Sequence, residues 1–97
     1  MSGFLIANYR VTNPEAYAAY PQAVVPTLLA YGGEILVADY ESEIVENEAS
    51  NVTVVVKFPS KESARAWYNS PGYQEIVRSR IDNTEGFLLF ADEFNMP

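Results

Sequence analysis

Tyrosines, a tryptophan and an arginine are the residues of this sequence that could bind or activate a small molecule. Tyr17 and Tyr20 lie three positions apart, and Tyr73 and Arg80 lie seven apart. Both spacings put a pair on one face of a helix. Because hydroxyls and a guanidinium donate hydrogen bonds, these groups could hold the oxyanion of a carboxylate or an enolate. The candidate ligand-binding residues from the helices are Tyr17, Tyr20, Trp67, Tyr73 and Arg80.

Each of these residues also has a structural interpretation. Tyr17 and Tyr20 fit the buried stripe of a helix, and Trp67 with Tyr68 fits a core wedge between helix and sheet. Arg80 falls on an apolar stripe where leucine would be routine, so its guanidinium needs acceptors. A structural ion pair or a helix C-terminus would supply them. A bound anion would supply them too.

The sequence contains no cysteine and no histidine. Disulfides, zinc–thiolate sites and cysteine nucleophiles are therefore excluded, together with the usual general base at neutral pH. We expect no cofactor, and in particular no haem, zinc or iron. Ser60 reads as a helix cap, because no histidine is present to activate it as a nucleophile. No catalytic residue can be identified from the sequence.

The formal net charge of −7 argues against a nucleic-acid partner. No apolar run approaches the ~20 residues that span a bilayer, and the N-terminus lacks the basic region of a signal peptide. We therefore expect a soluble cytoplasmic protein with no membrane association. Five acids lie between Asp39 and Glu48, and a solvated hairpin explains them better than a metal site, since the calcium-loop pattern is absent.

The first half of the chain predicts three strands and a helix. Residues 4–12 alternate like a strand, and Asn13-Pro14 then predicts a capped helix start. Pro21 and Pro26 should bend or split that helix, which Gly32-Gly33 ends. Residues 34–44 read as a strand, residues 45–51 as a polar hairpin tip, and residues 52–58 as a central strand.

The second half predicts two helices and a last strand. Ser60 caps a helix that carries Trp67, and Ser70-Pro71 ends it and starts a second helix that carries Tyr73 and Arg80. Gly86 then opens a strand over residues 87–94.

The resulting order, β-α-β-β-α-α-β, is the ferredoxin-like split βαβ arrangement of an α+β domain spanning residues 1–97. It has a four-stranded antiparallel sheet with helices on one face. The last strand is apolar on both faces, with Leu88 and Phe90 against Phe87 and Leu89. We expect the uncovered face to pack against a second copy, which makes a homodimer.

Several blocks of the sequence resemble one uncharacterised bacterial family, the domain-of-unknown-function family 1330. The blocks keep the order and spacing of the family over nearly the whole chain. They are NPEAYAAY (13–20), YGG (31–33), FPS (58–60), ARAWYNSPGY (64–73) and Arg80.

The resemblance implies a dimeric α+β barrel, in which two ferredoxin-like sheets pack face to face. Members of that superfamily include cofactor-independent monooxygenases, haem-degrading enzymes, muconolactone isomerases and dye-decolourising peroxidases, whereas the family itself has no established reaction. Asn13 replaces the usual aspartate, and both residues cap helices. Val45-Glu46-Asn47 stands where the family has Leu-Glu-Gly, and the match adds Glu46 to the candidate ligand-binding residues.

Three functions remain open from the sequence. The protein could bind a small organic acid or phenolic metabolite in a pocket between sheet and helices. It could be a cofactor-independent enzyme, monooxygenase-like or isomerase-like, that uses the same pocket. It could also be a purely structural or regulatory dimer, in which case the helix–sheet interface should be fully packed.

Overall fold

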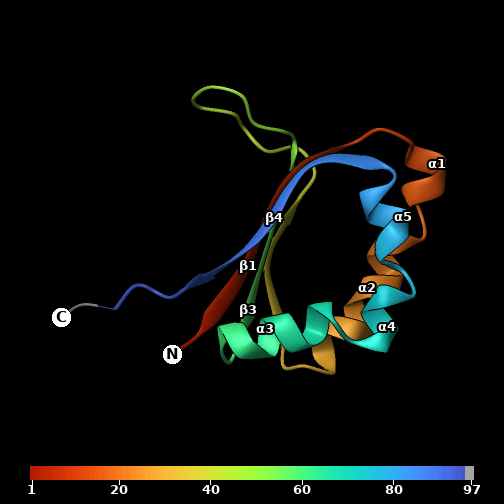
Figure 1. The fold of residues 1–97 in the computed structure, drawn as a ribbon. Coiled ribbons are helices and arrows are strands. Elements are labelled where there is room, and N and C mark those ends of the chain that lie inside the picture. The colour runs from red at the N-terminus through yellow and green to blue at the C-terminus, as the bar shows by residue number, and fades with distance from the viewer. Residues whose placement is uncertain (96–97) are drawn as a thin grey trace.

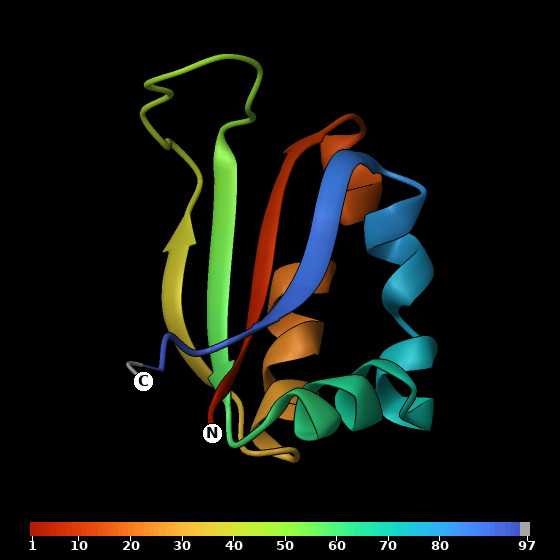
Figure 2. The same cartoon turned by 60° about the vertical axis from the view of Figure 1, so that its left-hand side comes forward.

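A computed structural model describes residues 1–95 as a four-stranded antiparallel sheet with all helices on one face (Figure 1). This confirms the ferredoxin-like α+β fold class, because the strand order across the sheet is β2-β3-β1-β4 (Figure 2). The elements in chain order are β1 (Gly3–Val11), α1 (Pro14–Tyr17), α2 (Tyr20–Leu29), β2 (Glu34–Asp39), β3 (Val52–Phe58), α3 (Lys61–Tyr68), α4 (Pro71–Gln74), α5 (Val77–Ile81) and β4 (Thr84–Asp92).

Strand alternation separates the two faces of the sheet. Leu5, Ala7 and Tyr9 of β1 are buried beneath the helices, and the residues between them are only half-buried. On the helix side one row runs across all four strands through Ile35, Val56, Leu5 and Phe90. The core forms where α2, α3 and α4 cover such rows, and its largest fully buried side chains are Trp67, Tyr73 and Phe58.

The opposite face of the sheet is bare and apolar at its centre. The corresponding row consists of Val37, Val55, Ile6 and Leu89. Leu89 is 44% exposed, and its neighbour on this face, Phe87, is 51% exposed. All helices of residues 1–95 lie on the other side of the sheet (Figure 1).

Side-chain caps begin three helices as the sequence predicts. Asn13, Ser60 and Ser70 each accept a hydrogen bond from the backbone N–H three residues later. Pro21 splits the first helical segment, because it occupies the first turn of α2. Pro26, in contrast, lies inside α2, where it is exposed and water can satisfy the carbonyl group that its ring leaves free.

The single helix that the sequence predicts after Ser70-Pro71, carrying Tyr73 and Arg80, is two short helices, α4 and α5. The chain tightens at Ile76, whose N–H donates to the Tyr73 carbonyl three residues back instead of continuing the α-helical ladder. Tyr73 and Arg80 nevertheless face each other, with 3.3 Å between Arg80 Nε and Tyr73 Oη.

The strand predicted to reach Ile44 ends at Asp39. The Asp39 carboxylate accepts from the Glu41 N–H at 2.8 Å and turns the chain away from the sheet. Residues 40–51 then form a long loop that projects past the sheet (Figure 2). Asn8 anchors the end of this loop, because its side-chain oxygen accepts from Ser50 N at 2.7 Å.

The last strand begins at Thr84, two residues before the predicted opening at Gly86. Gly86 lies within β4 opposite Tyr9, with a φ of 153°. A Cβ atom there would lie 2.2 Å from the Asn8 carbonyl oxygen, so the close approach of β1 and β4 requires glycine. The strand ends at Asp92, so Phe94, which the sequence places in it, lies beyond the strand and is exposed.

Gly32 follows α2 and ends that helical segment, as predicted, with a φ of 75°.

Candidate anion-binding site

The helices do not pack flush against the sheet. A cavity of about 250 Å³ lies between them, lined mainly by apolar side chains of β1, α2, β2 and β3. Its polar groups are few, and they are the hydroxyls of Tyr9, Tyr17, Tyr20 and Tyr40 and the guanidinium of Arg80. A mostly apolar hollow with a few convergent polar groups is typical of a small-molecule site.

Arg80 is buried without a carboxylate partner. Its side chain comes from α5 and is 8% exposed. Within residues 1–95 the ion pairs involve Arg10, Lys61, Arg65 and Arg78, and none involves Arg80. Its hydrogen bond to the described residues runs from Nε to the Tyr73 hydroxyl.

The terminal guanidinium nitrogens of Arg80 therefore border open space. In the described part of the chain, every side-chain nitrogen or oxygen that is fully buried has a hydrogen-bond partner. The terminal nitrogens of Arg80 have no such partner there, so they are not fully buried, and Arg80 lines the cavity. Burial opposes the charge of Arg80, but its interactions with Tyr73 and Tyr20 outweigh that effect and raise its pKa above the ordinary value. The guanidinium is thus a permanent cation that faces a mostly apolar hollow.

Arg80 favours one arrangement of the hydroxyl protons of Tyr73 and Tyr20. Arg80 can only donate, so the Tyr73 oxygen accepts from it. Either hydroxyl could donate in the 2.8 Å contact between Tyr73 and Tyr20, and we assign Tyr73 as the donor because its proton is completely buried and has no other acceptor among the described residues. The Tyr20 proton is then free to point into the cavity that Tyr20 lines. Arg80 and Tyr20 together present donors only, which is the arrangement that an oxyanion requires.

A second chain of hydroxyls runs from the cavity to the surface. Tyr9 Oη lies 2.7 Å from Tyr17 Oη, which lies 2.7 Å from Tyr40 Oη. Tyr9 is buried and Tyr40 is 41% exposed, so the chain can orient its protons inward or outward. Burial is the largest cause that raises the pKa of Tyr9 to about 12, and burial also raises the pKa values of Tyr17 and Tyr20. These hydroxyls are therefore donors at neutral pH.

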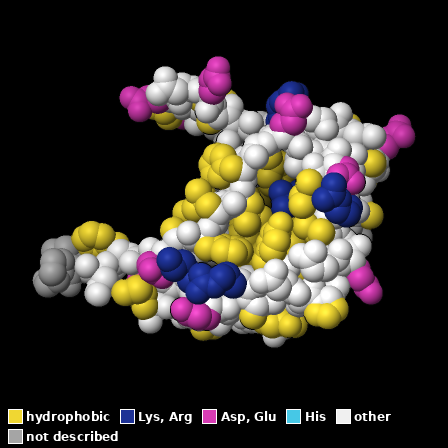
Figure 3. Space-filling view, in the orientation of Figure 1, with side chains coloured by type: hydrophobic (Ala, Val, Ile, Leu, Met, Phe, Trp, Pro, Cys, Tyr) yellow, Lys and Arg dark blue, Asp and Glu magenta, His cyan; other side chains and the backbone are white. Residues whose placement is uncertain are grey.

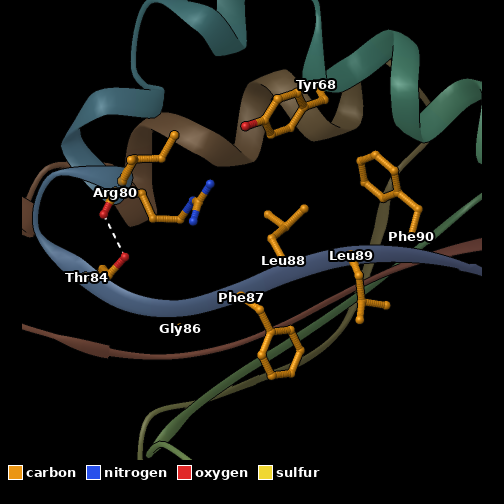
Figure 4. A pocket seen from close by; sticks show the side chains of 9 residues that line it. Tyr68, Arg80, Thr84, Gly86, Phe87, Leu88, Leu89 and Phe90 are labelled. Atoms are coloured by element: carbon orange, nitrogen blue, oxygen red, sulfur yellow. Dashed lines mark hydrogen bonds between the residues drawn. The ribbon is translucent and has the colours of Figure 1, made fainter.

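Behind Arg80 lies a second hollow. It has a volume of about 390 Å³ and follows the free edge of β4, from the ends of α3 and α5 round to Phe87 and Leu89 on the open face of the sheet. Figure 4 shows the Arg80 guanidinium, the Leu88 side chain and the Tyr68 hydroxyl directed toward one another, while Phe87 and Leu89 point to the other face. The space-filling view shows a hollow on this side, with yellow apolar walls and a basic side chain inside it (Figure 3).

The structure brings together most of the residues that the sequence singles out. Tyr17, Tyr20, Trp67 and Arg80 line the inner cavity. Tyr73 does not line it but supports Arg80 and Tyr20 from behind. Trp67 is 1% exposed and donates from Nε1 to Thr27 Oγ1 at 3.0 Å, so it is a core residue that also forms a wall.

Glu46 lies apart from the other candidates. It is exposed in the loop of residues 40–51 and lines neither hollow. The residues that sequence reasoning missed are Tyr9, Tyr40 and Tyr68. Tyr9 could have been found, because the alternation of β1 places it on the same face as Leu5 and Ala7. Nothing in the sequence places Tyr40 or Tyr68 beside the site.

A family model for a domain of unknown function (DUF1330) matches residues 2–94, nearly the whole chain. The chain belongs to this DUF1330 family. No curated protein matches it. Within residues 1–95, every helix falls short of the length and apolar character that a bilayer crossing requires. The acids of the described residues do not gather into a set that could hold a metal ion.

Solved structures share the fold of this DUF1330 protein. A protein of unknown function from Rhodopseudomonas palustris has a TM-score of 0.75 at 18% identity, and the match covers 98% of this chain and 84% of that one. SnoaB, a cofactor-independent oxygenase from Streptomyces nogalater, has a TM-score of 0.65 at 9% identity, with 98% and 95% covered. At such low identities the likeness shows the fold alone.

At Asn47, where the resemblance led us to expect glycine, the backbone is left-handed. Asn47 adopts a φ of 56°, in the left-handed region that glycine favours and that asparagine tolerates better than other side chains.

Proposed function

We propose that this DUF1330 protein binds a small organic acid or phenolic metabolite, in its anionic form, in the space between the sheet and the helices. Arg80 and the Tyr20 hydroxyl hold the oxyanion, and the apolar walls hold the body of the ligand. The observation that carries the proposal is the buried Arg80, which has no carboxylate partner among residues 1–95 and borders a cavity. A buried arginine without an anion is costly, and a ligand removes that cost.

Arg80→Met tests this proposal, because methionine keeps much of the apolar bulk and removes the charge. The probes are 2-naphthoate and its neutral analogue 2-naphthalenemethanol, titrated by calorimetry. We expect the variant to bind 2-naphthoate roughly ten- to a hundred-fold more weakly, the strength of a charge-assisted hydrogen bond, and to bind the alcohol as before.

Arg78→Met is the matched control, because Arg78 lies on the same helix but pairs with Asp82 at the surface. It should leave both affinities unchanged. Equal affinity of wild type and Arg80→Met for 2-naphthoate would contradict the proposal, as would the failure of every carboxylate and phenolate probe to bind the wild type.

The second candidate is a cofactor-independent enzyme that acts in the same cavity. Its support is the shared fold with an oxygenase of that kind. Neither hollow is lined by an aspartate or a glutamate of the described residues, and the buried tyrosines keep their protons. Such an enzyme would need a substrate that ionises by itself, so binding is the primary proposal. Turnover of a bound ligand would separate the two.

A homodimer through the open face of the sheet is part of the proposal. The row Val37, Val55, Ile6 and Leu89 is apolar, with its two ends exposed and its two central members half-buried, and such a surface could form the shared patch of a twofold interface. A stable interface should bury on the order of 1,200–2,000 Å². A dimer with a purely structural or regulatory role is the less favoured alternative, because the helix–sheet interface contains a cavity.

A further inference from the structure

Two residues, Arg80 and Leu88, line both the inner cavity and the outer hollow beside β4. Arg80 reaches in from α5 and Leu88 rises from β4, so together they form a waist between the two spaces (Figure 4). We propose that the two hollows are compartments of one site, whose ligand carries its oxyanion within its skeleton and an apolar group on each side. This inference rests on the proposed function of the cavity.

The position of the cation carries the inference. In a site for a terminal carboxylate, the charge would lie at the closed end of a single pocket. Here the guanidinium lies between two hollows of about 250 and 390 Å³. An anion bound at the waist therefore leaves room on both sides of it. A ligand with a terminal carboxylate would fill only one of the two hollows.

The inner compartment is lined mostly by apolar atoms, whereas the outer one presents polar and apolar atoms to a similar extent. Val24 and Ala38 border the inner compartment, and Ile81 and Phe90 border the outer one. Tyr68 packs edge-on against Phe90, with ring centroids 6.3 Å apart, and its hydroxyl points toward the waist (Figure 4). Aryl or branched alkyl groups match the inner walls and the side of the outer compartment formed by Ile81 and Phe90, whereas a charged or sugar-like group in the inner compartment would lose hydration without new partners.

The acidity of the ligand must come from the ligand itself. The lining of both hollows contains no carboxylate from the described residues, and the pKa values of Tyr9 and Tyr20 are raised by burial. A compound much more acidic than a simple ketone or alcohol is therefore required, with the proton released to solvent. The enol of a 1,3-dicarbonyl compound and an acidic phenol substituted on both sides have this chemistry, whereas simple ketones and alcohols do not.

Three probes that share a 1,3-dicarbonyl core but carry no, one or two aryl groups test the inference. Acetylacetone fills neither compartment, benzoylacetone fills one, and dibenzoylmethane can fill both. Binding is followed by the absorbance of the enolate, which should grow on binding because Arg80 stabilises that form. We expect dibenzoylmethane to bind at least about ten-fold more tightly than benzoylacetone, the gain from burying a second aryl group.

Two variants block one compartment each. Ala38→Phe fills the inner compartment, and Ile81→Trp narrows the outer one; both positions are exposed, so the fold should tolerate the larger side chains. Each should reduce the advantage of dibenzoylmethane over benzoylacetone to less than about three-fold. Ala66→Phe and Ile44→Trp are matched controls, since these exposed residues line neither hollow, and they should leave the advantage intact.

The outcomes separate this inference from the proposed function. If benzoylacetone binds through Arg80 but the second ring adds no affinity, or if neither blocking variant reduces the gain, the two-compartment site is wrong and the anion site remains. If Arg80→Met binds the enolates and 2-naphthoate as well as the wild type does, both proposals fail. Circular dichroism of each variant verifies that the fold is retained.

Discussion

The two faces of the sheet are built from similar apolar residues but differ in what surrounds the polar groups near them. On the helix side, buried tyrosine hydroxyls and Arg80 border a cavity. On the open side, the central row through Ile6 and Leu89 has no polar member, and the ion pair Arg10–Glu85 lies toward one end. A cavity with donors suits a ligand that comes and goes, whereas a bare apolar centre with charged margins suits a permanent partner.

We expect the largest effect from a charge placed on the open face, which should weaken the proposed dimer. Leu89→Glu places a carboxylate in the proposed dimer interface twice, once from each copy. An uncompensated buried charge costs several kcal/mol, so we expect the dissociation constant of the dimer to rise by more than about a hundred-fold. Sedimentation at micromolar concentration should then find a dimer for the wild type and a monomer for the variant.

Leu29→Glu is the matched control for that experiment, because Leu29 is 65% exposed on α2 and lines neither hollow. It should sediment as the wild type does. A wild type that is monomeric, or a Leu89→Glu protein that still dimerises, would show that the two faces do not differ in the way proposed here.

On the helix side of the sheet, the loss of a single hydroxyl should lower the stability of the protein. Tyr73→Phe leaves Arg80 Nε without its acceptor and removes the partner of the Tyr20 hydroxyl. A buried group without its hydrogen bond costs about 1–3 kcal/mol, so the free energy of unfolding should fall by that amount in urea titrations. Tyr31→Phe is the control, since Tyr31 is half-buried and its hydroxyl has no hydrogen bond within residues 1–95. Equal losses in the two variants would contradict the special role of the Tyr73 hydroxyl.

Much of the fold could be predicted because its signals are local. The alternation in β1 and the caps Asn13, Ser60 and Ser70 act within a few residues, and each appears in the structure. The end of β2 was placed too late, because the Asp39 carboxylate that turns the chain is indistinguishable in the sequence from a solvent-facing strand residue. The break at Ile76 was missed for a similar reason, since the apolar spacing continues through it.

The candidate site could be predicted only in part. The spacing of Tyr73 and Arg80 places them on one face without reference to the rest of the chain, and they do meet. The contact of Tyr17 with Tyr40 joins residues 23 positions apart, and that of Tyr20 with Tyr73 joins residues 53 apart. Such contacts depend on how the helices dock on the sheet, which a single sequence does not encode in any short pattern.

The difference between the faces should also appear, more weakly, as a dependence of stability on alkaline pH. Burial raises the pKa of Tyr9 to about 12, whereas the unfolded chain has the ordinary value of about 10. The folded protein thus keeps a proton that the unfolded chain loses, so this stabilisation is complete below pH ~10 and disappears as the pH rises toward ~12. The open-face row has no ionisable side chain and should add nothing in this range.

Tyr9→Phe isolates this contribution. Lysines also titrate above pH ~10, but they are the same in wild type and variant, so the difference between the two proteins reports Tyr9 together with its hydrogen-bond partner Tyr17. In urea titrations from about pH 8 to about pH 11, the free energy of unfolding of the wild type should fall more steeply than that of Tyr9→Phe, by at most about 1.4 kcal/mol per pH unit. Parallel curves would show that the pKa of Tyr9 is ordinary in the folded protein. Water would then reach the Tyr9 hydroxyl, although the structure buries it against Tyr17.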